Sequence, residues 1–315
     1  MKTVLVEPLT ISAENLEALA KNLKADGNDF VAYDTKPTST EDWLERTKDA
    51  DHIILANTKM PAEVIEKNEN LKYINIAFTG TDHVPVDLAK SKGIIVSNAA
   101  GYSDQAVAEL AIGMTINLLR DIKKADWGTR NKMQTSDFLG QEIAGKKVGI
   151  IGHGKIGLRT AELFKAYGAD LYAYNRSQSQ KALDLGVKYA DLDELLKISD
   201  IVTIHLPLND STRDTIGERE LGLMKESAIL INCARGPIVN TKALVDALKN
   251  KKIAGAGIDV FDTEPPFTAG EEILDQDLSL LTPHIGFFTK ESMAKRAKIV
   301  FANAEDFLND KEIKT

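Results

Sequence analysis

Short runs of β-branched and other apolar residues alternate with helix-like segments along most of the 315-residue chain. Strand-like runs in the first third of the chain cover 3–7, 52–57, 73–78 and 93–98. A second series is apolar at both odd and even positions, as expected of strands that are buried on both faces. Its runs cover 147–152, 169–175, 201–206, 228–234 and 254–261. This alternation predicts an α/β fold built from doubly wound parallel sheets.

Longer segments between these runs show helical spacing. From 103 to 124, apolar residues recur every three or four positions, which predicts one long helix. A second helix pattern covers 155–167 and is ended by Gly168. The stretch from 126 to 147 is polar and shows no clear periodicity. The tail from 289 to 308 predicts a single helix, which is too short to form a domain and must pack against one.

Length and composition narrow the class of protein. A chain of 315 residues is long enough for two domains. Its formal net charge of −8 argues against a general role on nucleic acid or on an acidic membrane. Cys233 is the single cysteine, which fits a reducing compartment, and no apolar run approaches the ~20 residues that span a bilayer. We therefore expect a soluble cytoplasmic protein without a signal peptide.

A glycine motif points to a dinucleotide. Residues 148–157 read Val-Gly-Ile-Ile-Gly-His-Gly-Lys-Ile-Gly, between a strand pattern and a helix pattern. In that context Gly152 permits the tight turn, Gly154 lets the backbone approach the pyrophosphate, and Gly157 lets the helix pack close to the strand. The helix N-terminus then offers free amides to the phosphates. The alternative is a tight turn without a ligand.

The next strand pattern ends at Asn175, Arg176 and Ser177. NAD-preferring domains carry an acidic residue near this point, which accepts a hydrogen bond from the ribose 2′-hydroxyl. Here an arginine beside a hydroxyl could bind a 2′-phosphate through charge-assisted hydrogen bonds. The sequence therefore favours NADP and leaves NAD possible. The alternative is a solvated turn in which Ser177 caps the following helix.

Three later segments deliver reactive side chains to the carboxyl ends of strands, where ligands of open α/β sheets bind. They carry Arg235, Asp259, Glu264 and His284. Reduction of a 2-keto acid needs a cation for the carboxylate, which Arg235 can supply, and a proton for the carbonyl oxygen, which His284 can supply. Glu264 could accept a hydrogen bond from the second ring nitrogen. Asp259 is better suited to orient the nicotinamide carboxamide.

Each of these side chains also has a plain structural interpretation. Arg235 could form a surface ion pair, His284 could be a core or capping residue, and the two carboxylates could be solvated. Among the other histidines, His153 could shape the glycine loop and His205 could line the cofactor cleft, whereas His52 and His83 look structural. The histidine spacing predicts no metal site. Cys233 is interpreted as a small buried residue rather than a nucleophile.

Taken together, these segments resemble the D-isomer-specific 2-hydroxyacid dehydrogenase family over nearly the whole chain. Residues 98–109 look like the family's entry helix between domains, 149–157 are similar to its cofactor loop, and Arg235, Glu264 and His284 match its catalytic signatures. The resemblance implies hydride transfer between NAD(P)H and C2 of a small 2-keto or 2-hydroxy acid. It also marks further neighbours of the dinucleotide, namely Lys155, Ile156, Pro207, Thr212, Ala234 and Gly286.

The resemblance further implies a discontinuous architecture. A flavodoxin-like substrate domain would comprise 1–99 and 288–315, and a Rossmann cofactor domain would be inserted as 100–287. Family members commonly form homodimers, and 102–131 would then supply much of the interface. The substrate carboxylate would be held by the loop whose first residues are Phe78, Thr79 and Gly80.

Several residues depart from the family pattern. Phe287 and Phe288 replace small residues and could narrow the substrate pocket. The loop 56–58 lacks the basic residue of phosphoglycerate-oxidising members, so glyoxylate or hydroxypyruvate is favoured over phosphoglycerate. A dehydrogenase-like corepressor that senses the cofactor remains an alternative on the same fold. A formate-type dehydrogenase is disfavoured because it would have glutamine at Glu264.

Overall fold

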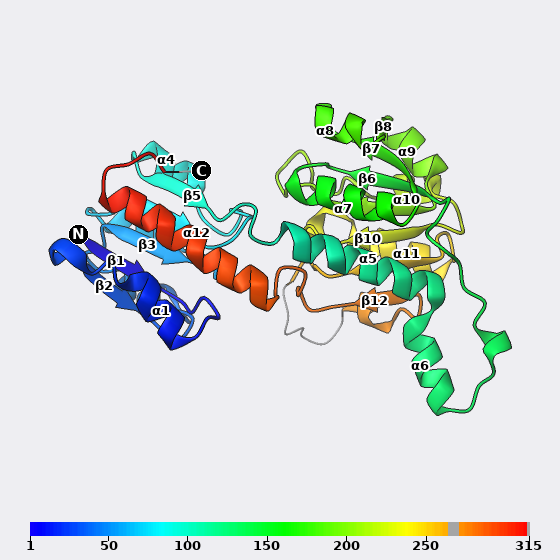
Figure 1. Ribbon diagram of the computed structural model, residues 1–315, viewed down its shortest axis with the longest axis horizontal. Coiled ribbons are helices and arrows are strands. Elements are labelled where there is room, and N and C mark those ends of the chain that lie inside the picture. The colour runs from blue at the N-terminus through cyan, green and yellow to red at the C-terminus, as the bar shows by residue number, and fades with distance from the viewer. Residues whose placement is uncertain (264–270, 314–315) are drawn as a thin grey trace. The chain divides into compact units, whose positions relative to one another are not determined.

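The computed structural model describes residues 1–263 and 271–313, which divide into two compact units. The first unit combines Met1–Ser103 with Thr289–Thr315, and the second comprises Asp104–Phe288. Each contains one parallel sheet covered by helices, so the predicted α/β fold with two parallel sheets is confirmed (Figure 1).

The first unit has a five-stranded sheet in the order β2-β1-β3-β4-β5. Its strands are β1 (Lys2–Leu5), β2 (Asp29–Ala32), β3 (His52–Leu55), β4 (Tyr73–Ile76) and β5 (Ile95–Asn98). Its helices are α1 (Ala13–Ala20), α2 (Thr40–Arg46), α3 (Ala62–Lys67), α4 (Val86–Ser91) and α12 (Lys290–Leu308), with a 3₁₀ turn η1 (Ala25–Gly27).

The tail helix α12 belongs to this first unit although it is the last element of the chain. Thr289 caps it through a hydrogen bond that its Oγ1 accepts from Ser292 N at 3.1 Å. The helix packs against α1 and β4. There Asn75 donates its Nδ2 to the carbonyl oxygen of Val300 at 2.7 Å, and Val300 is fully buried. The predicted tail helix is therefore confirmed.

The second unit has a seven-stranded sheet in the order β12-β11-β10-β9-β6-β7-β8. Its strands are β6 (Lys147–Ile151), β7 (Asp170–Tyr174), β8 (Lys188–Tyr189), β9 (Ile201–Ile204), β10 (Ile229–Asn232), β11 (Gly255–Ile258) and β12 (Ser279–Leu281). The chain runs from β6 outward to β8 and then returns to the other side of β6 at β9. The strand order therefore reverses between β6 and β9, which is where doubly wound sheets bind their ligands.

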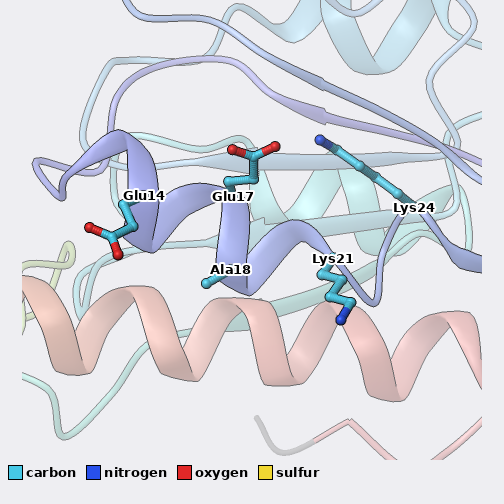
Figure 2. Close-up of a pocket in the computed structure, with 5 residues that line it drawn as sticks. All are labelled: Glu14, Glu17, Ala18, Lys21 and Lys24. Carbon is cyan, nitrogen blue, oxygen red and sulfur yellow. The ribbon is translucent and has the colours of Figure 1, made fainter.

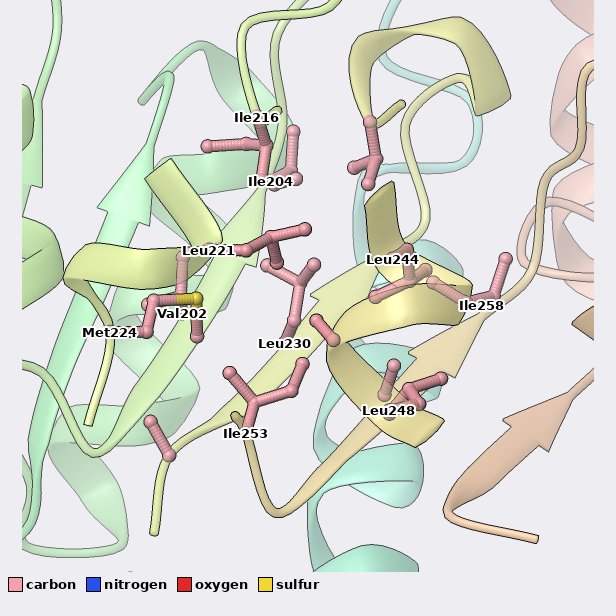
Figure 3. Packing of buried hydrophobic residues seen from close by; sticks show 14 of the residues in the cluster. Val202, Ile204, Ile216, Leu221, Met224, Leu230, Leu244, Leu248, Ile253 and Ile258 are labelled. Atoms are coloured by element: carbon pink, nitrogen blue, oxygen red, sulfur yellow. The ribbon is translucent and has the colours of Figure 1, made fainter. Parts of the chain in front are cut away.

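Helices cover both faces of this second sheet. They are α5 (Asp104–Arg120), α6 (Ile122–Arg130), α7 (Lys155–Ala166), α8 (Gln180–Asp184), α9 (Leu192–Ile198), α10 (Glu218–Leu223) and α11 (Thr241–Lys249), with the 3₁₀ turns η2 (Thr135–Asp137), η3 (Gly236–Ile238) and η4 (Glu272–Asp275). Helices α5 and α7 cover one face. Figure 3 shows the core on the other face, where side chains of α10 and α11 interdigitate with those of β9, β10 and β11.

The single helix predicted over 103–124 is wrong in one respect. Helix α5 ends at Arg120, and Asp121 has a φ of 49°, in the left-handed region. Helix α6 then leaves in a new direction (Figure 1). One left-handed residue is sufficient to break the helical hydrogen-bond ladder, and aspartate tolerates this conformation better than most residues.

Candidate functional site

The loop after β6 has the geometry that the glycine motif predicts. Gly152 has a φ of 86°, and a Cβ there would lie 2.9 Å from Leu206 Cδ2 and 3.0 Å from the backbone of His205. A Cβ on Gly157 would overlap the carbonyl oxygen of Gly152, so the first turn of α7 lies directly against the loop. By contrast, a Cβ on Gly154 would meet nothing within 4 Å. The loop is therefore closely packed at Gly152 and Gly157 and has free space at Gly154.

This opening coincides with the start of α7. Gly154 is the N-cap and offers no side-chain acceptor to the first amides, which include those of Lys155 and Ile156. The free N–H groups and the positive end of the helix dipole suit an anionic ligand. The helix continues for three turns and ends before Gly168, which has a φ of 81° as a C-terminal glycine should.

The turn after β7 places the predicted ribose-binding residues side by side. Asn175 donates its Nδ2 to the carbonyl oxygen of Ser177 at 2.9 Å, while Arg176 and Ser177 are exposed. The N-cap of α8 is Ser179, whose Oγ accepts from Ala182 N at 3.2 Å. The alternative in which Ser177 caps that helix is therefore wrong, and its hydroxyl is not committed to a cap.

The end of β9 faces the glycine loop. His205 donates its backbone N–H to Ile151 O at 2.8 Å, and its Nε2 lies 3.0 Å from Thr203 Oγ1. Burial lowers the pKa of His205 to about 4, so its imidazole is neutral at pH 7. Beyond it, Thr212 donates its hydroxyl to Pro207 O at 2.6 Å, which closes the 207–212 loop.

Arg235 follows β10 in a short segment that Asn232 organises. Asn232 Oδ1 accepts from Ala234 N at 3.0 Å, and its Nδ2 donates to Arg235 O at 2.9 Å. The guanidinium of Arg235 donates from Nη1 to Ala234 O at 2.8 Å. A Cβ on Gly236 would overlap the backbone of Phe261, so the segments after β10 and β11 lie in contact. The backbone of Arg235 is thereby fixed.

Asp259 anchors the histidine segment. Its Oδ1 accepts from Thr282 Oγ1 at 2.5 Å and from Ile285 N at 2.8 Å, and its Oδ2 accepts from Gly286 N at 2.8 Å. Burial raises the pKa of this carboxyl group, and the three hydrogen bonds oppose that rise. Its backbone also takes part, because Asp259 O accepts from His284 N at 2.8 Å. A buried carboxylate therefore fixes the loop that carries His284.

His284 itself has a φ of 55°, in the left-handed region. Its ring meets Phe287 edge to face, with the centroids 5.2 Å apart and the planes at 84°. Asp259 N donates to Asn232 O at 3.0 Å, so the Arg235 and His284 segments share one hydrogen-bond network. Glu264 lies outside the described residues. Sequence reasoning missed Asn232 and Thr282, and the available signal was a polar residue at the end of a buried strand.

The predicted substrate loop lies at the carboxyl end of β4 in the first unit. Phe78 is 5% exposed and meets His83 edge to face at 6.0 Å, and its carbonyl oxygen accepts from Ala99 N at 3.0 Å. Thr79 O accepts from Asn98 Nδ2 at 2.9 Å. In the described residues, the buried Thr79 Oγ1 has no hydrogen-bond partner. Gly80 is half-buried.

Other features of the described residues add no competing site. A shallow groove along α1 is lined by exposed side chains, none of them predicted for the site (Figure 2): Glu14, Glu17, Ala18, Lys21 and Lys24. Among all the residues that the structure describes, no group of three or more metal-ligating side chains lies together. No described helix is both long and apolar enough to cross a bilayer. Cys233 is buried as predicted, and burial raises its thiol pKa.

A parallel sheet of this strand order, with a glycine loop at its reversal point, defines a dinucleotide-binding Rossmann domain. Residues 112–286 match the family model described as "D-isomer specific 2-hydroxyacid dehydrogenase, NAD binding domain". The chain belongs to this family. It is an oxidoreductase that uses a nicotinamide cofactor and acts on 2-hydroxy acids.

Curated relatives agree with this assignment. A hydroxypyruvate reductase from Blautia hydrogenotrophica is 32% identical over 98% of this chain and 97% of its own length. A glyoxylate reductase from Thermococcus litoralis is 37% identical over 82% of this chain and 81% of its own. A D-3-phosphoglycerate dehydrogenase from Methanocaldococcus jannaschii is 40% identical over 82% of this chain, but the match spans only 50% of that longer protein.

Among solved structures of similar proteins, one contains NADPH and another contains NAD. An acyclic imino acid reductase in complex with NADPH and D-Arg has a TM-score of 0.90 and 30% identity, covering 99% of both chains. A D-lactate dehydrogenase from Aquifex aeolicus, complexed with NAD and lactic acid, has a TM-score of 0.87 and 28% identity, covering 98% of this chain and 96% of the other.

Proposed function

We propose that this protein is a 2-keto acid reductase that acts reversibly on glyoxylate, hydroxypyruvate or a similar small acid. The observation that carries the proposal is the network around Asp259 and Asn232. It holds the backbone of the adjoining segments that carry the predicted acid His284 and the predicted carboxylate ligand Arg235. A catalytic pair must be held in place before substrate arrives, and buried hydrogen bonds to the backbone that carries both residues support such a role.

In the proposed reaction, bound NAD(P)H supplies the hydride to C2 of the keto acid. Arg235 holds the substrate carboxylate through its planar guanidinium. His284 donates a proton to the carbonyl oxygen as C2 is reduced, and in the reverse direction it accepts the proton of the hydroxyl. Glu264, which the family resemblance pairs with the histidine, would stabilise the imidazolium form.

The dinucleotide would lie along the second unit. Gly152, Gly154 and the first amides of α7, those of Lys155 and Ile156, would hold the pyrophosphate, and Gly157 would let α7 pack closely enough to present them. His205, Pro207, Thr212, Ala234 and Gly286 would complete the lining, with Asp259 nearest the nicotinamide. We favour NADP because the side-chain amide of Asn175 is engaged within its own turn, while the exposed Arg176 and Ser177 can reach a 2′-phosphate.

The family resemblance also assigns a substrate-binding role to the loop of the first unit that carries Phe78, Thr79 and Gly80. A phosphorylated acid is disfavoured by Glu7, which is fully buried at the end of β1. Its carboxylate accepts from Ala56 N at 2.9 Å, from Thr58 N at 3.0 Å and from Thr58 Oγ1 at 2.7 Å. Those donors are therefore already committed to one anion, and a phosphate nearby would be repelled.

A steady-state screen of keto acids against NADPH and NADH tests the proposal, with nicotinamide absorbance as the readout. We expect turnover of glyoxylate or hydroxypyruvate, with the lower KM for NADPH. Tight cofactor binding without turnover of any acid would support the corepressor-like alternative. Preferred oxidation of phosphoglycerate would contradict the substrate assignment.

A further inference from the structure

An unassigned cluster surrounds the imidazole of His153, in the middle of the glycine loop. His153 is 8% exposed. Its Nε2 lies 2.6 Å from the hydroxyl oxygen of Tyr189 and 3.2 Å from the carbonyl oxygen of Ser177. The two rings also meet nearly edge to face, with centroids 5.2 Å apart. One buried side chain therefore connects the glycine loop, the turn after β7 and the edge strand β8.

The same cluster also contacts the C-terminal end of the turn formed by 175–179. Tyr189 Oη accepts a hydrogen bond from Ser179 N at 3.0 Å. Ser177 O, already near His153, also accepts from Asn175 Nδ2 at 2.9 Å. The backbone of 175–179 is thus fixed at both ends, while the side chains of Arg176 and Ser177 stay exposed.

The second ring nitrogen of His153 differs from the first in its hydrogen bonding. Its Nδ1 is buried and has no hydrogen-bond partner among the described residues. A neutral imidazole carries one donor and one acceptor. Ser177 O can only accept, so the contact that fixes the turn needs the ring proton on Nε2, and Nδ1 is then a buried acceptor that lacks a donor. A ribose hydroxyl bound at the adjoining loop would supply that donor.

We infer that His153 and Tyr189 are positioning residues for the 2′-phosphate of a phosphorylated adenine dinucleotide. They hold the 175–179 turn so that Arg176 and Ser177 converge on the 2′ position. The benefit falls on the phosphorylated cofactor, because only its 2′-phosphate needs both side chains ordered at once. This inference rests on the NADP preference proposed above and adds two residues that do not themselves carry the charge.

The test compares dissociation constants for NADPH and NADH in the full-length protein, together with the fragments 2′,5′-ADP and 5′-AMP. Tyr189→Phe removes one hydroxyl and keeps the ring contact, and His153→Leu removes both ring nitrogens. We expect each to weaken NADPH and 2′,5′-ADP about tenfold, or about 1.4 kcal/mol. The constants for NADH and 5′-AMP should change less than about twofold. His153→Gln, which keeps a polar group near the Nε2 position, should recover part of the loss.

Tyr172→Phe is the matched control. Tyr172 lies on β7 beside the same edge strand, and its ring packs under Lys188 Nζ at 5.3 Å, outside the His153 cluster. It should leave the NADPH to NADH ratio unchanged. Equal weakening of both cofactors in Tyr189→Phe and His153→Leu would show that the cluster only supports the fold, and it would overturn the inference.

Arg176→Ala separates this inference from the proposed cofactor preference. If Arg176→Ala leaves the cofactor ratio unchanged while Tyr189→Phe lowers it, the proposed role of Arg176 fails, and the cluster acts on the 2′ position through Ser177 and the backbone of the turn alone. If none of these variants changes the ratio, both fail. Thermal unfolding identifies any variant that loses its fold, and His153→Gln then supplies the decisive comparison.

Discussion

At the scale of single residues, the candidate site depends on side chains whose roles the sequence pattern does not reveal. Arg235 and His284 were predicted because each follows a strand pattern, and ligands of open α/β sheets bind at the carboxyl ends of strands. Nothing in the local pattern indicated that Asn232 joins their segments, since its role arises from hydrogen bonds to residues distant along the chain. The conformation of His284, with a φ of 55°, was equally inaccessible because tertiary contacts impose it.

Replacing His284 with asparagine tests the acid role without straining the backbone. Asparagine tolerates a positive φ, so the loop held by Asp259 should keep its shape. We expect kcat to fall by about 10²–10⁴-fold, because proton transfer to the carbonyl oxygen is lost. NADPH affinity, measured by fluorescence titration, should change less than about twofold. Near wild-type kcat would remove His284 from the mechanism.

His52 gives the first unit a pH-dependent stability. It is fully buried, and burial lowers its pKa from 6.5 to about 3. Below pH 6.5 the unfolded chain binds a proton that the folded unit excludes. The free energy of unfolding therefore decreases as the pH is lowered, by up to about 1.4 kcal/mol per pH unit. Between pH 6.5 and 5, thermal unfolding of His52→Gln should show a shallower pH dependence than the wild type. His83→Gln serves as the control, and identical slopes for wild type and His52→Gln would contradict this expectation.

At the scale of elements, the central strands, the edge strand β5 and the β6–α7 unit were predictable, and the other three edge strands were not. The strands missed in the sequence are β2, β8 and β12, and all three are edge strands. An edge strand has less of its surface buried, so its apolar pattern is weak. The break at Asp121 was also missed, because the apolar spacing continues across it.

The packing of α7 on the glycine loop predicts that one glycine substitution lowers the stability of the fold and another lowers only the affinity for the cofactor. Gly157→Ala places a Cβ against Gly152 O, so we expect a loss of about 1–3 kcal/mol in unfolding free energy. Gly154→Ala meets open space in the protein and should leave the melting temperature within about 2 °C, since only a small change in free energy is expected. Its new methyl group should nevertheless weaken NADPH, because the pyrophosphate needs that space. Equal melting temperatures for the two variants would refute this account.

At the scale of the whole molecule, the family resemblance and the surface both favour a homodimer. Within the described residues of 102–131, the largest exposed apolar side chain is Trp127 on α6, at 59%, and Ile122 on the same helix is 46% exposed. A partner surface that covers both side chains would remove their apolar area from water, which favours association.

Sedimentation velocity of the wild type and Trp127→Glu tests this expectation. We expect a dimer for the wild type and a shift toward monomer for the variant, because a buried carboxylate without a partner is costly. Tyr167→Glu, at an exposed position on the C-cap of α7, is the matched control and should remain dimeric. A dimer that persists unchanged in Trp127→Glu would place the interface elsewhere.

The assignment of α12 to the first unit has a consequence for biosynthesis. A ribosome releases the strands β1 to β5 before it makes the second unit, yet the helix that buries Val300 against β4 is made only after that unit. The second unit is contiguous in the chain and can finish folding while the nascent chain is still attached. The first unit, whose strands are made before the second unit, is therefore completed after it, and until then its sheet needs protection from aggregation.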